Sequence, residues 1–127
     1  MQLKMQDILG FTSFYDTVKN QKLTMKTAYR LARLAKAIED ELQFYREKLQ
    51  AIIREYGEMD EQGNPIPTED GNGIKLRPGT EVDCFTAMKE LQEINVELPD
   101  IQFSIEDFEN IELTTNDIAV MLPFFKD

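Results

Sequence analysis

The sequence predicts a mainly α protein: a long helix with a shorter antiparallel partner helix, an N-terminal helix, two short C-terminal helices and a small β element. Apolar side chains recur every three or four residues from position 25 to position 56. A second helical pattern follows a stretch rich in glycine and proline, and helix-start signals stand near the C-terminus. We expect residues 1–127 to form a single elongated domain, because the charged content of 30% exceeds the usual globular share.

The first element is expected to be a less regular helix near the N-terminus. Its apolar residues are Ile8, Leu9, Phe11, Phe14, Tyr15 and Val18. Gly10 stands among them and interrupts the pattern, because glycine weakens a helix interior.

The long helix is predicted over Met25–Tyr56. Its apolar positions are Leu31, Leu34, Ile38, Leu42, Tyr45, Leu49, Ile52 and Tyr56. From Ile38 onward they follow a heptad spacing, which lets a second helix lie along this one. Thr24 can cap the start, and Gly57 suits a left-handed residue at the end.

Residues 58–79 are expected to form a turn-rich linker or hairpin. The segment holds four of the six glycines, and residues 66–68 could pair with residues 74–76. A calcium loop beginning at Asp60 is the tempting alternative. It fails because the twelfth position of such a loop would be Gly71, where an EF-hand requires glutamate.

The remaining elements follow in order. Thr80 with Asp83 predicts the start of the partner helix, whose apolar face is Val82, Phe85, Met88 and Leu91, as far as Ile94. Residues 96–98 or 101–103 are candidates for an edge strand, since Pro99 separates them. Two further start signals predict short helices over 105–110 and 115–122. The adjacent pair Phe124 and Phe125 predicts a docked tail.

Charge is distributed unevenly along the chain. Residues 1–57 hold ten basic and seven acidic side chains, net +3, whereas residues 58–127 hold four and seventeen, net −13. Helical stepping places Lys22, Lys26, Arg30 and Arg33 in one sector, which we call the basic ridge. Such cations oppose the helix dipole and need an offset, either from acidic groups of the protein or from phosphates. We favour pairing with protein carboxylates, because a net charge of −10 repels DNA.

Phe44 is expected on the same side of the long helix as the ridge, where a large apolar group often marks a contact surface. Cover by the N-terminal helix is the equal alternative. Lys22, Lys26, Arg30, Arg33 and Phe44 are therefore the candidate partner-binding residues.

The sequence offers no candidate catalytic residue, metal site or cofactor site. It has no histidine and one cysteine, so the commonest general base and zinc ligands are missing. No segment has the length and apolar character of a membrane span, and no signal peptide is recognised. We expect no membrane association and no direct binding to nucleic acid. A homo-oligomer is left open.

One resemblance adds to this interpretation. The segments from Thr27 to Lys36, Glu55 to Glu58 with Asp60, Val96 to Leu98, and Leu113-Thr114 with Asp117 resemble small acidic proteins encoded by phages and prophages of Gram-positive bacteria. The similarity extends from about residue 20 to the end. It implies a protein made in a bacterial host cytoplasm, with virion association left open, and it brings no catalytic residue.

The leading hypothesis is a non-enzymatic phage-type accessory protein that binds another protein, in particle assembly or as a modulator of a host factor. The alternative is an acidic inhibitor that imitates nucleic acid and occupies a host defence nuclease or another DNA-binding enzyme. An enzyme that uses carboxylates and a divalent metal is the third and least favoured hypothesis.

Overall fold

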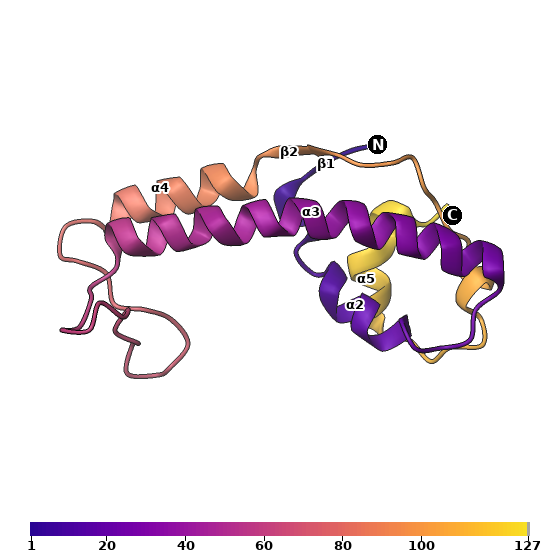
Figure 1. The fold of residues 1–127 in the computed structure, drawn as a ribbon, viewed down its shortest axis with the longest axis horizontal. Coiled ribbons are helices and arrows are strands. Elements are labelled where there is room, and N and C mark those ends of the chain that lie inside the picture. Colours follow the sequence, from indigo (N-terminus) through magenta and orange to yellow (C-terminus); the bar gives the residue numbers. More distant parts are fainter. Residues whose placement is uncertain (127) are drawn as a thin grey trace. The chain divides into compact units, whose positions relative to one another are not determined.

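A computed structural model describes residues 1–126 and confirms the mainly α fold (Figure 1). The elements, in chain order, are β1 (Gln2–Lys4), α1 (Met5–Ile8), α2 (Phe11–Val18), α3 (Met25–Tyr56), α4 (Glu81–Gln92), β2 (Asn95–Glu97), the 3₁₀ helix η1 (Ile105–Phe108), α5 (Thr115–Met121) and the 3₁₀ helix η2 (Leu122–Phe124).

The chain divides into two compact units. Unit 1 comprises Met1–Leu42 and the chain from Asn95 onward, and unit 2 comprises Gln43–Ile94. Helix α3 has the predicted bounds and contributes its first part to unit 1 and its second part to unit 2. The single elongated domain expected for residues 1–127 stays a prediction.

Unit 1 holds the main hydrophobic core. Its helices α1 and α2 confirm the interrupted N-terminal helix, with Gly10 between them. A Cβ at Gly10 would lie 2.6 Å from Val120 Cγ1, so a larger residue would push α2 away from α5. Buried residues of this core include Met5, Ile8, Phe14, Leu34, Ile38, Phe103, Met121 and Phe124.

A two-stranded antiparallel sheet lies at one side of unit 1. Strand β2 confirms one of the two predicted edge strands, and its Val96 is buried opposite Leu3 of β1. Strand β1 was not predicted from the sequence. Its three residues are too few for their alternation to indicate a strand, and its partner lies more than ninety positions away.

Both predicted helix starts in the C-terminal segment of unit 1 are confirmed, since η1 begins at Ile105 and α5 at Thr115. Thr114 Oγ1 accepts a hydrogen bond from Asp117 N at 3.1 Å, and the Asp117 carboxylate accepts one from Thr114 N at 3.0 Å. This reciprocal box starts α5. The helix predicted over 105–110 is shorter, since only one turn of 3₁₀ helix forms.

The predicted docking of the tail is confirmed. Phe124 is fully buried, and Phe103 N donates to Phe124 O at 2.7 Å. Lys126 N donates to Phe103 O at 2.8 Å. The two bonds form a single parallel β-bridge between Phe103 and Phe125 of the tail. The docked tail carries Lys126 to the edge of unit 1.

In unit 2, α4 runs back beside the second part of α3 (Figure 1). The segment between the helices pairs with itself as predicted, since Lys75 N donates to Ile66 O at 2.8 Å and Thr68 N to Gly73 O at 2.9 Å. Gly57 is not left-handed, contrary to the prediction. It extends into a bridge with Leu76, and a Cβ there would lie 2.5 Å from Ile53 O.

The predicted apolar face of α4 is only partly buried. Leu91 is 4% exposed, but Val82 and Phe85 are 77% and 70% exposed. On a 100° helical wheel, Val82 lies about 180° and Phe85 about 120° from Leu91, so both point away from the side of α4 that Leu91 occupies. The prediction that they pack on α3 is therefore wrong.

Candidate partner-binding surface

The basic ridge begins where the chain enters α3. Thr24 Oγ1 accepts a hydrogen bond from Thr27 N at 3.3 Å, which confirms the predicted cap. Thr27 is 2% exposed, and its hydroxyl donates to Asp107 Oδ1 at 3.1 Å. The first turn of α3 is thereby tied to η1, eighty positions further along the chain.

The Asp107 carboxylate accepts hydrogen bonds from both η1 and α3. Its Oδ2 accepts hydrogen bonds from Ser104 N at 2.9 Å and from Arg30 Nη2 at 3.4 Å. Partial burial of the carboxylate would raise its pKa. The hydrogen bonds from Ser104 and Thr27 and the charge of Arg30 outweigh burial, and the pKa of Asp107 is held below its ordinary value.

Arg30 is paired within unit 1, although its buried Nε has no hydrogen-bond partner among the described residues. Besides its ion pair with Asp107, its Nη1 donates to Gln102 O at 3.1 Å, and its guanidinium carbon lies 5.3 Å from the centre of the Phe103 ring. The favoured interpretation, in which ridge cations meet acidic groups of the same protein, holds for this residue. Arg30 is a structural residue as well as a candidate contact.

Arg33 and Lys126 lie beside Arg30 around a shallow hollow, which we call the basic cleft. It has a volume of about 330 Å³ and is lined by Arg30, Arg33, Asp100, Ile101, Gln102 and Lys126. Three of these side chains are cationic and one is acidic. None of the ion pairs found among residues 1–126 involves Arg33 or Lys126. The cleft therefore presents positive charge on a protein of net charge −10.

An exposed aromatic ring extends the basic cleft. Tyr29 is 64% exposed, and the Arg33 guanidinium carbon lies 5.9 Å from the centre of its ring. A tyrosine beside an arginine gives a surface both flat apolar contact and hydrogen bonding.

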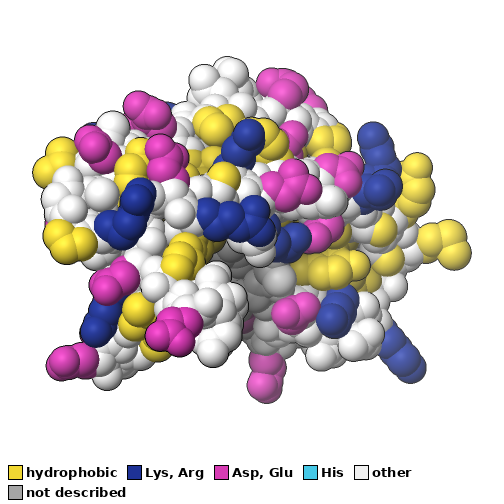
Figure 2. All heavy atoms as spheres, turned by 60° about the vertical axis from the view of Figure 1, so that its left-hand side comes forward, with side chains coloured by type: hydrophobic (Ala, Val, Ile, Leu, Met, Phe, Trp, Pro, Cys, Tyr) yellow, Lys and Arg dark blue, Asp and Glu magenta, His cyan; other side chains and the backbone are white. Residues whose placement is uncertain are grey.

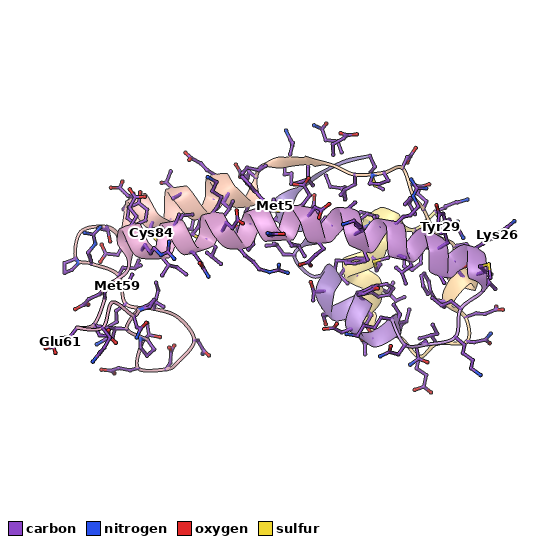
Figure 3. All side chains as sticks on the ribbon, in the orientation of Figure 1. Met5, Lys26, Tyr29, Met59, Glu61 and Cys84 are labelled. Carbon is purple, nitrogen blue, oxygen red and sulfur yellow. The ribbon has the colours of Figure 1, made fainter. Side chains whose placement is uncertain are left out.

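The other ridge lysines are placed differently. Lys26 is exposed in the first turn of α3, where it projects outward with Tyr29 (Figure 3). Lys22 precedes the helix, so its assignment to the ridge by helical stepping is wrong. It lines a separate small hollow together with Thr24, Thr27 and Asp107.

Phe44 belongs to unit 2, whereas Lys26, Arg30 and Arg33 of the ridge belong to unit 1, as does Lys22. It is 39% exposed, and Lys48 Nζ lies 5.5 Å from the centre of its ring. That Phe44 and the ridge act as one contact surface stays a prediction.

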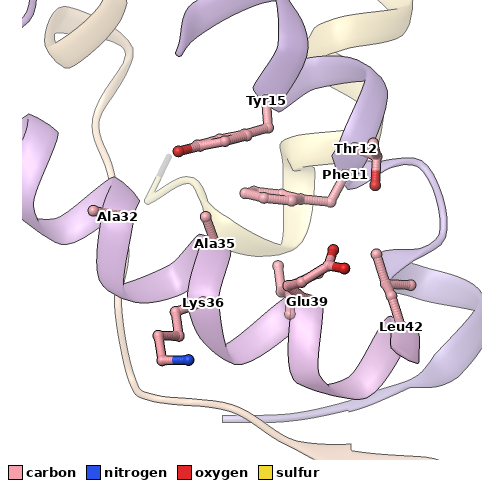
Figure 4. A pocket seen from close by; sticks show the side chains of 9 residues that line it. Phe11, Thr12, Tyr15, Ala32, Ala35, Lys36, Glu39 and Leu42 are labelled. Carbon is pink, nitrogen blue, oxygen red and sulfur yellow. The ribbon is translucent and has the colours of Figure 1, made fainter. Parts of the chain in front are cut away.

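A third hollow of unit 1 lies between α2 and α3 (Figure 4). Its volume is about 320 Å³. The rings of Phe11 and Tyr15 are stacked with centres 5.8 Å apart, and they lie across from the small side chains of Ala32 and Ala35. Lys36 and Glu39 also line this groove, but it has no set of neighbouring cations like that of the basic cleft.

Sequence reasoning found Arg30 and Arg33 but missed two of their neighbours. Asp107 carried a partial signal, since its spacing from Ser104 predicts a helix start, but nothing local to it indicates the contacts with Thr27 and Arg30. Lys126 carried no signal, because only the pairing of the tail with Phe103 brings it to the cleft.

Within residues 1–126, no cluster of acidic, cysteine or histidine side chains could hold a metal ion. Over the same residues, no helix is both long enough and apolar enough to cross a membrane. No protein-family model, curated protein or solved structure matches the chain.

Proposed function

We propose that the protein is a non-enzymatic accessory protein of the phage type, which acts by binding another protein in particle assembly or as a modulator of a host factor. The observation that carries this proposal is the basic cleft. Arg33 and Lys126 have no ion pair among the described residues, although the chain carries 24 carboxylates. A surface with unmatched cations suits a partner that supplies the carboxylates.

The chemistry of the cleft favours a protein carboxylate over nucleic acid. A guanidinium group recognises carboxylates and phosphates through paired hydrogen bonds. A chain of net charge −10 repels DNA at long range, whereas an acidic side chain on a folded partner is a local target. We therefore propose that the partner places an acidic segment in the basic cleft, next to Tyr29.

Affinity purification from infected or lysogenic bacterial cells tests this proposal. The test variant carries Arg33→Glu and Lys126→Glu. The control carries Arg54→Glu and Lys89→Glu, which change the net charge equally at exposed positions of unit 2. Arg30 is left intact, because its loss would strand the Asp107 carboxylate. A separate Phe44→Ser variant tests the predicted role of Phe44.

We expect proteins retained by the wild type and by the control to be lost from the cleft variant. Equal retention by all three would contradict the proposed surface. Retention by the cleft variant but not by Phe44→Ser would move the surface to unit 2.

The nucleic-acid-mimicking inhibitor remains the alternative. Such a mimic needs a surface dominated by carboxylates. On the face shown in Figure 2, Asp and Glu side chains are interspersed with Lys and Arg, which gives this hypothesis less support. Affinity for a DNA-binding enzyme that falls steeply with salt would favour it.

A further inference from the structure

Unit 2 buries much less apolar surface than unit 1. Among the described residues, Leu91 is the only buried apolar side chain of unit 2, while all the other buried apolar side chains belong to unit 1. The heptad positions Tyr45, Leu49, Ile52 and Tyr56 are only half-buried. Most of the stability of a protein helix comes from packing its apolar face. The two helices of unit 2 thus leave apolar surface that further helices would cover.

Part of that surface forms a groove, which we call the unit 2 groove. It has a volume of about 420 Å³. From α3 it is lined by Phe44, Lys48, Ala51, Ile52 and Glu55, from α4 by Ala87, Glu90 and Leu91, and after α4 by Ile94. Phe44 and Ile94 are 39% and 36% exposed. On the face shown in Figure 2, hydrophobic side chains reach the surface between charged ones.

The α3 side of this groove has a charge pattern that complements itself. Lys48 and Glu55 stand two helical turns apart on one side of α3, with Ala51 between them. None of the ion pairs found among residues 1–126 involves Lys48 or Glu55. If two copies of α3 lie antiparallel around a two-fold axis midway between these residues, each Lys48 faces Glu55 of the second copy. One axis therefore forms the same ion pair twice.

We infer that the unit 2 groove binds a second copy of the chain, with the second parts of the two α3 helices antiparallel about this axis. The small side chain of Ala51 lies near the crossing point, where it lets the two helices approach to about 8–10 Å. In this arrangement the second copy removes the side chains of Phe44, Ile52 and Ile94 from contact with water. This surface is separate from the basic cleft, and the inference does not depend on the proposed function.

A second copy fits the groove better than an unrelated helix. Lys48 and Glu55, the two charged residues on the α3 side of the groove, each have their opposite at the symmetric position, which an isologous contact requires and a contact with another protein does not. The overlap centred between positions 48 and 55 also falls within the part of α3 that belongs to unit 2.

A charge swap tests this contact on the full-length chain. Sedimentation equilibrium over a range of concentrations would measure association of the wild type, Lys48→Glu, Glu55→Lys, and the double variant with both changes. The residues three and four positions from Lys48 are Phe44, Tyr45, Ala51 and Ile52, none of which is charged. The swap at Lys48 therefore disturbs no ion pair within the helix. Arg54→Glu is the control, on an exposed position that does not line the groove.

We expect the wild type and the control to reach twice the chain mass of 14.7 kDa. Each single reversal turns two attractions into repulsions and should weaken association roughly tenfold or more. The double variant should recover, because the pairs form again with opposite sign.

The inference would be overturned by a wild type that stays monomeric at every concentration. It would also fail if the single reversals left association unchanged, or if the double variant stayed as weak as the single ones. If the chain does not self-associate but still retains a co-purifying partner through the basic cleft, the inference fails and the proposed function is unaffected. If it self-associates as expected but the cleft variant retains every partner, the proposed function fails and the inference is unaffected.

Discussion

A single carboxylate joins two segments of unit 1, the η1 turn and the beginning of α3. Asp107 caps η1 through Ser104 N, accepts from the Thr27 hydroxyl in the first turn of α3, and pairs with Arg30 one turn later. These partners favour the ionised form, so they stabilise the fold only while Asp107 is charged. Arg30 thereby belongs to the structure of unit 1, and the neighbouring Arg33 does not.

The lowered pKa of Asp107 predicts a pH-dependent contribution to stability. In the unfolded chain the carboxyl titrates near its ordinary value of 3.8, and in the folded protein it titrates at lower pH. Its contribution is therefore complete above the unfolded value and is lost as the pH falls through the folded value. Asp107→Asn should lower the unfolding free energy by about 1–3 kcal/mol at neutral pH, and the difference from wild type should shrink in strong acid.

Urea unfolding at a series of pH values measures this difference. Glu106→Gln is the matched control, since Glu106 is an exposed neighbour in the same 3₁₀ turn. A difference between Asp107→Asn and wild type that stays constant from neutral to strongly acidic pH would contradict the assigned role of the carboxylate.

At the scale of elements, helix α4 shows that apolar residues of one sequence pattern can differ in burial, since Leu91 is buried and Phe85 is exposed. Leu91→Ala should cost about 2–4 kcal/mol, because it removes buried methyl groups. Phe85→Ala should change the unfolding free energy by less than about 0.5 kcal/mol, because the ring is 70% exposed. Chemical denaturation of the two variants compares them directly. A large loss for Phe85→Ala would show that this ring is covered in solution.

Local signals predicted the elements, and long-range pairing explains what they missed. Each of the two helix-start signals, at Ser104 and at Thr114, involves residues only three positions apart, so both can be recognised in the sequence. Strand β1 exists only through its pairing with β2, and Lys126 reaches the cleft only through Phe103. The apolar pattern of α4 could not show that Val82 and Phe85 lack a covering element, because periodicity marks a face and not its partner.

At the scale of the whole molecule, the contrast in burial between the units predicts a contrast in local stability. Opening unit 2 exposes one buried apolar side chain, whereas opening unit 1 exposes the entire aromatic core. Local opening costs less free energy where fewer apolar contacts are lost. Amide hydrogen exchange should therefore be faster at positions 45–56 of α3 than at positions 31–42 of the same helix.

Dilution provides the control for this measurement. If a second copy covers the unit 2 groove, exchange in α4 and in the second part of α3 should speed up at low protein concentration, and exchange in unit 1 should not. Equal protection along the length of α3 would contradict the difference between the units.

The cations of α3 and the tail are of two kinds: Arg30 is held by the protein, whereas Arg33 and Lys126 have no ion pair among the described residues. The unfolding free energies of Arg30→Ala, Arg33→Ala and Lys126→Ala test this division most directly. We predict a loss of about 1–3 kcal/mol for Arg30→Ala, and less than about 0.5 kcal/mol for the other two. If Arg33→Ala or Lys126→Ala destabilised the protein as much as Arg30→Ala, these cations would be structural, and the basic cleft would not be a binding surface.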